Sequence, residues 1–389
     1  MPVGEPATPR LRASLLTLAV GLLAGAVAAQ DPIPISDYSH SLDIYAFSQD
    51  DDDGRGGNPL QAEGFDYTSL RLDLTHPLDK RRTLRGEAVI AFIRNDPALP
   101  VPPTVINATT TSASGNLTTL DALLGADLSP EGSGWTYSPG LFYHHQIDYI
   151  GTGFDFAVQR DLFDGDTQLG FSYVLRYDFL ELKWWDGTDH GSANRMANNF
   201  LFNWDQHLSP SVKTSLAAQY TRQDGFLSDQ YNFVAIFTPA GVPILYDDER
   251  LPDTRNRGQL NARLRWSPRL DTSVGLDLSY YFDDWDIETV SGTVSFESVF
   301  RKLRVRVWYR LAVQDETKYF ARMPTSPSQL QTQDSDLGSF TLHAPGMTVS
   351  YPLGRWLEKD SVLRFTVWGF SRDDGVDGLG AKIGVQLSW

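Results

Sequence analysis

Cysteine is absent from the 389-residue chain, which excludes disulfides, thiol nucleophiles and thiolate metal sites. Beyond residue 30 the sequence has no run of about 18 apolar residues, so we expect no transmembrane helix there. The motifs G-x-S-x-G and H-E-x-x-H and a phosphate-binding loop are also missing. These absences predict a protein with no catalytic residue, no metal site and no cofactor.

Basic residues are in deficit: 33 of them face 49 acidic residues, and the net charge is -16. An acidic surface disfavours nucleic acid as a partner. The acidic run Asp50–Gly54 suggests calcium, but Gln49 occupies the first position of the calcium-loop motif and Leu60 the twelfth, where Asp and Glu belong. We therefore interpret this run as a solvated acidic loop.

The first 29 residues have the features of a secretory signal peptide. Arg10 and Arg12 precede the apolar run 13–23, and small residues follow from Ala24 to Ala29. Cleavage after Ala28 or Ala29 is expected, which leaves residues 30–389 as one domain. A helical membrane anchor is the alternative, but the apolar run is short for that role.

Segments of alternating apolar and polar residues recur along the rest of the chain. Leu70, Leu72 and Leu74, for example, alternate with Arg71 and Asp73. When no helix spans the membrane, only a closed barrel can place such apolar faces in lipid. We predict an all-β fold, a transmembrane antiparallel up-and-down β-barrel of about 14 strands. The predicted strands are 38–48, 65–75, 83–94, 142–158, 167–183, 196–207, 211–222, 256–267, 271–283, 286–299, 302–314, 339–351, 361–371 and 378–389.

Two classes of connection alternate between these strands. The short class comprises 76–82, 161–166, 208–210, 267–269, 300–302 and 352–360. The long or acidic class comprises 50–64, 95–141, 184–195, 225–255, 283–286, 315–338 and 371–378. Short periplasmic turns and long external loops are typical of outer-membrane barrels, and an even strand number places both termini in the periplasm. The loop 95–141 is long enough to form a constriction, a partner contact or a mobile surface loop.

The chain finishes on an alternating strand, with Ala381, Ile383, Val385 and Leu387 on one face and Trp389 at its end. A terminal aromatic on such a strand resembles the sorting signal that the barrel assembly machinery reads in Gram-negative bacteria. The predicted location is therefore the cell outer membrane, with lipid and lipopolysaccharide as partners. No plug domain of the TonB-dependent transporter kind is expected before the first strand.

Aromatic residues make up 12% of the chain, enough for girdles at both membrane interfaces. The candidate interface aromatics at the external strand ends are Trp184, Trp185 and Trp285. At the periplasmic ends they are Trp266, Trp356 and Trp389. Trp308 and Trp368 fall on predicted inner faces, where they either plug the lumen or indicate a wrong register.

Charged residues are prominent on the predicted inner faces. The pore-lining candidates are Arg263, Arg265, Asp277, Arg304, Arg306, Arg310 and Arg364. One interpretation is a basic lumen that attracts anions. The other, which we favour, is a lattice of ion pairs with acidic residues of the same facing, because charge in a lumen must be paired or hydrated. Those acidic residues are Asp73, Glu87, Asp148, Asp178, Asp205 and Asp277.

The adjacent residues His144 and His145 point to opposite faces of a predicted strand and cannot bind one metal. An outer-membrane hydrolase at the barrel rim would need a Ser–His pair with an orienting group, or paired carboxylates. No motif places such groups together. We therefore expect no enzyme, with the rim hydrolase as the least favoured alternative.

Three segments carry a family resemblance: 225–231 (GFLSDQY), 251–257 (LPDTRNR) and 279–287 (SYYFDDWDI). In order and spacing they resemble an uncharacterised outer-membrane β-barrel family, the domain of unknown function 3570, best over 210–300. The resemblance implies the fold and the outer-membrane address, and it brings no activity and no catalytic residue. It also implies a redox-linked context, since genes of this family lie beside flavin-transferase and thioredoxin-like genes.

The sequence predicts a passive porin-like channel for small polar or anionic solutes, because passive transport needs only a hydrated lumen. The main alternative is a non-conducting barrel that acts as a scaffold for a periplasmic or redox partner.

Overall fold

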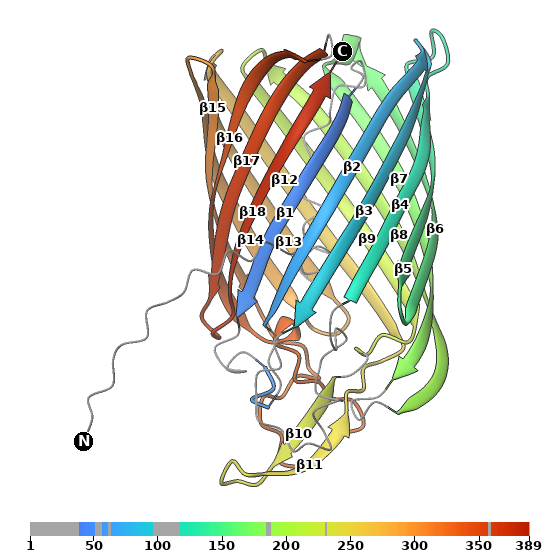
Figure 1. Cartoon of the computed structure of the whole chain (residues 1–389), viewed down its shortest axis with the longest axis vertical. Coiled ribbons are helices and arrows are strands. Elements are labelled where there is room, and N and C mark those ends of the chain that lie inside the picture. The colour runs from blue at the N-terminus through green and yellow to red at the C-terminus, as the bar shows by residue number, and fades with distance from the viewer. Residues whose placement is uncertain are drawn as a thin grey trace, which may run out of the picture.

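The computed structural model describes residues 39–50, 57–60, 64–95, 117–183, 188–229, 232–356 and 359–388. Within these residues, 16 strands form a closed antiparallel barrel, and a two-stranded sheet extends beyond one end of it (Figure 1). No helix in this part of the chain is long and apolar enough to cross a membrane. The predicted all-β barrel is confirmed, while the predicted signal peptide lies outside the described residues.

The first eight barrel strands are β1 (Ser39–Asp50), β2 (Phe65–Asp79), β3 (Arg82–Asn95), β4 (Leu117–Leu128), β5 (Trp135–Gln146), β6 (Tyr149–Leu162), β7 (Thr167–Lys183) and β8 (Asp189–Ser209). The other eight are β9 (Val212–Gly225), β12 (Thr254–Arg269), β13 (Thr272–Asp283), β14 (Glu288–Phe300), β15 (Leu303–Gln314), β16 (Phe340–Trp356), β17 (Lys359–Arg372) and β18 (Asp377–Ser388). The separate sheet pairs β10 (Phe233–Phe237) with β11 (Pro243–Asp248). Two short 3-10 turns are η1 (Phe163–Gly165) and η2 (Ser335–Leu337).

The barrel closes between its first and last strands. β1 pairs with β18 from Ser39 opposite Ser388 to Asp50 opposite Asp377. Lys382 of β18 faces inward, where its Nζ lies 2.8 Å from Asp43 Oδ2. The alternating tail of the sequence is therefore the closing strand, and Trp389 itself lies outside the described residues.

Alternation along each strand separates an apolar outer face from a polar inner face. On β12, Leu260 and Trp266 are 53% and 50% exposed on the outside. Asn261 and Arg263 point to the inside, where the Arg263 side chain is only 16% exposed. Exposed large apolar side chains recur in this way around the barrel. A continuous apolar surface of this kind requires lipid, since soluble proteins rarely expose apolar patches of more than a few hundred Å².

The predicted number of about 14 strands is too low, because the expected loop 95–141 contains β4 and the start of β5. The predicted strand 142–158 likewise proves to be the end of β5 and most of β6, joined by the turn 147–148. β4 escaped the pattern because Leu123 and Leu124 are consecutive and break its alternation. β5 escaped because Pro139 and Gly140 are residues that weaken a strand assignment. The connection 96–116 lies outside the described residues.

The short and long connections lie at opposite ends of the barrel, as predicted. Short turns such as 80–81, 210–211 and 270–271 lie at the end where β1 begins and β18 finishes. The other end carries the connections 226–253 and 315–339, and the hairpin β10–β11 projects from it (Figure 1). The turn 147–148 is a short connection at this long-loop end, which the sequence pattern did not predict.

Candidate functional site

The three segments that carry the family resemblance meet at the long-loop end of the barrel. The backbone N–H of Leu251 donates to Ser228 Oγ at 2.9 Å, which joins the first segment to the second. Leu227 and Leu251 both pack against the buried cluster that contains Trp285 and Ile287 of the third segment. Segments that are up to about 60 residues apart in the sequence thus form one structural node.

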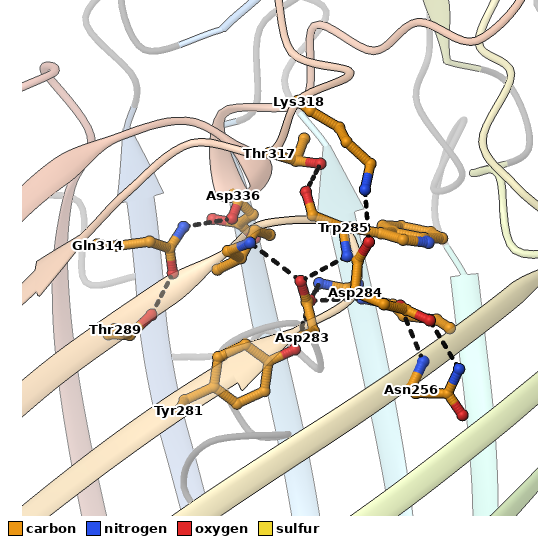
Figure 2. Close-up of polar contacts among 12 residues, drawn as sticks. Asn256, Tyr281, Asp283, Asp284, Trp285, Thr289, Gln314, Thr317, Lys318 and Asp336 are labelled. Carbon is orange, nitrogen blue, oxygen red and sulfur yellow. Dashed lines mark hydrogen bonds and ion pairs between the residues drawn. The ribbon is translucent and has the colours of Figure 1, made fainter.

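Asp283 is the centre of this node, and its side chain is fully buried. Its Oδ2 accepts hydrogen bonds from Arg255 Nε and from the Tyr281 hydroxyl, each at 2.8 Å. Its Oδ1 accepts from the backbone N–H groups of Trp285 and Ile287, each at 3.0 Å (Figure 2). A buried carboxylate is tolerated only when it is paired and hydrogen-bonded in this way. Asp283 therefore ties the β13–β14 turn to the barrel wall.

Trp285 lies inside this node and not at a lipid interface, contrary to the sequence-based expectation. It is 2% exposed, and its Nε1 donates to the Thr254 carbonyl oxygen at 3.0 Å. The Arg255 guanidinium lies 4.2 Å from the centre of its ring. The turn that follows β13 folds Trp285 back over the barrel wall, a reversal that strand alternation alone does not encode.

The node also fixes the connection 315–339. Gln314 Nε2 donates to the Asp336 carbonyl oxygen at 2.8 Å, and Thr317 Oγ1 donates to the Trp285 carbonyl oxygen at 2.7 Å (Figure 2). The fully buried Arg372 side chain of β17 donates to Asp336 Oδ1 at 2.8 Å. Both ends of the connection are thereby held at the rim.

The connections at this end form a packed unit, here named the loop cap and defined as residues 226–229, 232–253 and 315–339. Arg250 and Gln331 exchange backbone hydrogen bonds of 3.0 and 2.7 Å, so the two connections pair with each other. Gln333 Oε1 accepts from the backbone N–H of Ala235 in β10 at 2.7 Å. The hairpin β10–β11 is therefore bound to the second connection.

Glu249 is buried inside the loop cap. It accepts hydrogen bonds from the Thr332 hydroxyl at 2.5 Å and from the backbone N–H of Asp229 at 2.7 Å. Burial, together with the negative charge of Asp229, raises the pKa of Glu249 to about 8. The cap thus contains an acid that holds its proton near neutral pH.

Charges on the inner face of the barrel pair mainly along the wall. Arg263 Nε and Arg265 Nη2 of β12 reach Asp277 of the adjacent β13 at 2.7 and 2.8 Å. Further pairs between neighbouring strands are Arg71–Glu87, Arg85–Asp127, Arg176–Asp155, Arg195–Asp178, Lys213–Asp205 and Lys382–Asp43. Ion pairs between neighbouring strands are therefore present, as the lattice interpretation expects. Most of the predicted acidic residues, however, pair with basic residues that are not among the pore-lining candidates.

The other four nominated arginines form what we name the arginine strip: Arg304, Arg306, Arg310 and Arg364. Arg304 and Arg364 flank Ser350 of β16 at one level. The closest carboxylate oxygen to Arg304 belongs to Glu297, at 3.7 Å, and Arg364 Nη2 donates to the amide oxygen of Gln386 at 3.4 Å. Among the described residues, no carboxylate lies within ion-pair distance of Arg306 or Arg310. The positive charge of the strip is therefore compensated less than that of the paired arginines on the same wall.

Trp308 and Trp368 lie at the same level as each other on the inner face, at β15 and β17, with Gly346 of β16 between them. A Cβ atom added to Gly346 would meet the Trp308 ring at 2.1 Å, and one added to Gly380 would meet the Trp368 ring at 2.2 Å. Each indole therefore lies flat against a glycine of the next strand. The two tryptophans cover the wall and do not cross the lumen.

The remaining sequence candidates fall in several places. Trp266 is on the outer face near the short-turn end. Trp184, Trp185 and Trp389, together with the side chain of Trp356, lie outside what the structure describes. His144 points inward, where its Nδ1 lies 2.7 Å from Asp121 Oδ1, whereas His145 stacks on Tyr143 of the outer face. Among the described residues, no group of three or more His, Asp or Glu side chains could hold a metal ion.

Sequence reasoning missed Arg255 and Asp283 as interacting residues. The alternation along the strand could have identified Arg255 as inward-facing, because it lies an even number of positions before the inward-facing Arg263 and Arg265. The missing information was the pairing of β12 with β13, which sets Arg257 opposite Asp283 and brings Arg255, two residues away on the same face, within hydrogen-bond distance of that carboxylate. That register depends on the turn between the strands, and the motif segments alone do not specify it.

A closed antiparallel barrel with an apolar outer face and a charged inner face defines an outer-membrane β-barrel. Residues 181–363 match the model of a family described as "Protein of unknown function (DUF3570)". The match includes all three segments of the node, and it confirms the family resemblance seen in the sequence.

Several solved structures are similar to this chain along most of its length. A "Bacterial polysaccharide outer membrane secretin" has 10% identity and a TM-score of 0.47, covering 90% of this chain and 98% of its own. OmpT of Vibrio cholerae, as a loop deletion mutant, has 9% identity and a TM-score of 0.46, with 91% and 98% covered. OccK1 of Pseudomonas aeruginosa has 12% identity and a TM-score of 0.40, with the same coverage. A comparison with curated protein sequences finds no match.

Proposed function

We propose that this outer-membrane barrel is a passive channel with a preference for small anionic solutes. The observation that carries the proposal is the contrast within the inner wall. Most inward-facing charges pair with a neighbour on the wall, whereas Arg306 and Arg310 have no carboxylate partner among the described residues. Positive charge without a counter-charge raises the local concentration of anions and sets selectivity.

The arrangement of the large inner side chains supports the same proposal. Ion pairs between neighbouring strands hold the long charged side chains along the inner wall, and the indoles of Trp308 and Trp368 lie flat against it. A side chain held against the wall leaves the barrel axis to water and solute. The proposal assigns no chemical reaction to the barrel.

Conductance of the purified full-length protein in a planar bilayer tests this function. We expect discrete conductance steps, and in a salt gradient a reversal potential of the sign that anion preference gives. Replacing Arg306 by Gln should reduce that preference, because it removes one uncompensated charge from the strip. The control is Arg222→Gln, which removes the same charge from the outer face, where Arg222 pairs with Asp224.

A folded barrel that carries no current would overturn the channel and favour the scaffold alternative. Cation preference in the unmodified protein would overturn the role of the arginine strip while leaving conduction intact.

A further inference from the structure

We propose that the inner wall beneath the node holds a binding site for a small hydroxylated carboxylate of about the size of a sugar acid. The site is a recess of about 130 Å³ on four adjacent strands. Its lining side chains are Asn199, Gln219, Thr221, Arg257, Gln259 and Tyr281. Binding at this site does not depend on conduction, so the site is separate from the proposed channel.

The barrel register builds the recess from two levels of inward-facing residues. Asn199 of β8 lies opposite Thr221 of β9, which lies opposite Arg257 of β12. At the next level Gln219 of β9, Gln259 of β12 and Tyr281 of β13 are aligned. Uninterrupted pairing of four strands therefore brings an arginine, three amides, a hydroxyl and an aromatic ring together.

Arg257 is available to a ligand because its nearest acid is already occupied. In the register Arg257 lies opposite Asp283. The five hydrogen bonds that the Asp283 carboxylate accepts among the described residues come from Arg255, which gives two, from Tyr281 and from the following turn. Arg257 Nε is buried without a hydrogen-bond partner. A guanidinium in this situation favours an anionic ligand, since hydrogen bonds between charged groups are among the strongest in proteins.

Two acceptors near Arg257 indicate what else the ligand carries. Asn199 Oδ1, in the recess, and Gln223 Oε1, two residues from Thr221 on the same face of β9, are also buried without a hydrogen-bond partner. Unsatisfied buried acceptors are costly and are relieved by a donor. A turn of these side chains toward a bound molecule would pair them with its hydroxyl groups.

The size of the recess and the aromatic ring of Tyr281 narrow the class of ligand further. The recess of about 130 Å³ is slightly smaller than the cavity of about 150 Å³ that holds one benzene ring, so a single six-membered ring would fill it and the ring substituents would extend through its open side. Tyr281 is the aromatic residue of the lining and supplies apolar surface for a sugar ring. Among the described residues, none that lines the recess is a carboxylate that would repel an acid. A ring that carries one carboxylate and several hydroxyls meets all of these features.

Titration calorimetry of the full-length barrel in detergent, with D-glucuronate as the probe, tests the site. We expect saturable binding of glucuronate, weaker by at least tenfold for glucose, which lacks the charge, and for acetate, which lacks the hydroxyls. Arg257→Gln should weaken glucuronate binding by about tenfold, the loss expected for one charged hydrogen bond. Arg222→Gln, which loses the same charge from the outer face of the same region, should bind within about twofold of the unmodified protein.

Asn199→Leu provides a second variant that keeps the charge and the branched shape of the side chain and removes the amide. It should weaken glucuronate binding and leave the weak binding of acetate unchanged. Absence of saturable glucuronate binding by the unmodified protein would overturn the site, as would equal binding by Arg257→Gln and the unmodified protein. A barrel that binds glucuronate but carries no current would overturn the channel and retain the site.

Discussion

At the scale of single residues, Glu249 shows how the loop cap responds to pH. The pKa of this buried acid is raised from about 4.5 to about 8, so the folded cap binds the proton more tightly than the unfolded chain does. The stability that protonated Glu249 contributes is fully present below about pH 4.5 and is lost as the pH rises through about 8. The cap should therefore loosen in mildly alkaline solution.

Hydrogen exchange of the β10 amides checks this prediction. Between about pH 6 and about pH 9, after correction for the intrinsic exchange rate, protection in Phe233–Phe237 should fall by at least tenfold. Glu249→Gln, which resembles the protonated acid, should abolish that pH dependence, whereas Glu316→Gln on the cap surface should retain it. Equal protection at both pH values in the unmodified protein would contradict the assignment.

Within the node, two arginines of the same strand face have different partners. Arg255 and Arg257 are two residues apart on one face of β12, yet only Arg255 bonds Asp283. The difference arises because the carboxylate has a limited number of acceptor positions and the turn 284–287 uses two of them. One arginine therefore stabilises the fold, and its neighbour keeps the capacity to bind a ligand.

At the scale of strands, close contact between tryptophan and glycine holds two large side chains against the inner wall. Trp308 and Trp368 rest on glycines of the following strands, Gly346 and Gly380. The sequence placed both tryptophans on the inner face, as the structure does. It could not show whether they plug the lumen, because the answer depends on which residue of the neighbouring strand lies beside each ring.

Gly346→Ala tests that arrangement. The new methyl group would lie about 2.1 Å from the Trp308 ring, so the indole must leave the wall and enter the lumen. Single-channel conductance should fall, and overpacking should cost about 1–3 kcal/mol of folding free energy. Gly292→Ala is the matched control, since its methyl group meets only Leu278 at 3.5 Å.

The double variant Gly346→Ala, Trp308→Ala should recover the conductance, because the displaced ring is then absent. A normal conductance in Gly346→Ala alone would contradict the prediction that the displaced indole enters the lumen.

At the scale of the whole molecule, lipid and water face opposite sides of one sheet. Leu260→Arg would put a charge on the lipid side, at a cost of about 2–4 kcal/mol if it lies at the bilayer midplane. Asn261→Arg, one residue later, puts the same charge on the inner side and should change stability by less than about 1 kcal/mol. Urea unfolding of the barrel refolded in lipid vesicles measures both values. A larger loss of folding free energy in Asn261→Arg than in Leu260→Arg would mean that the two faces of β12 are exchanged.

The alternation of residues by itself determined the barrel class, the inner and outer faces, and the end of the barrel that carries long loops. These properties follow from the two-residue period of a strand, which is local and can be read wherever it is regular. It failed at β4 and β5, where Leu123, Leu124, Pro139 and Gly140 interrupt the period. The sequence also identified the three segments that carry the family resemblance, but it did not predict that they contact one another.

The tertiary structure alone decided which inward-facing groups meet. Strand register set the triad of Arg263, Arg265 and Asp277, left Arg306 and Arg310 without a carboxylate partner among the described residues, and formed the recess beside Arg257. The turn after β13 withdrew Trp285 from the lipid interface. The physical reason is that pairing between strands depends on turns and on the closure of the whole barrel, which no single segment of alternating residues contains.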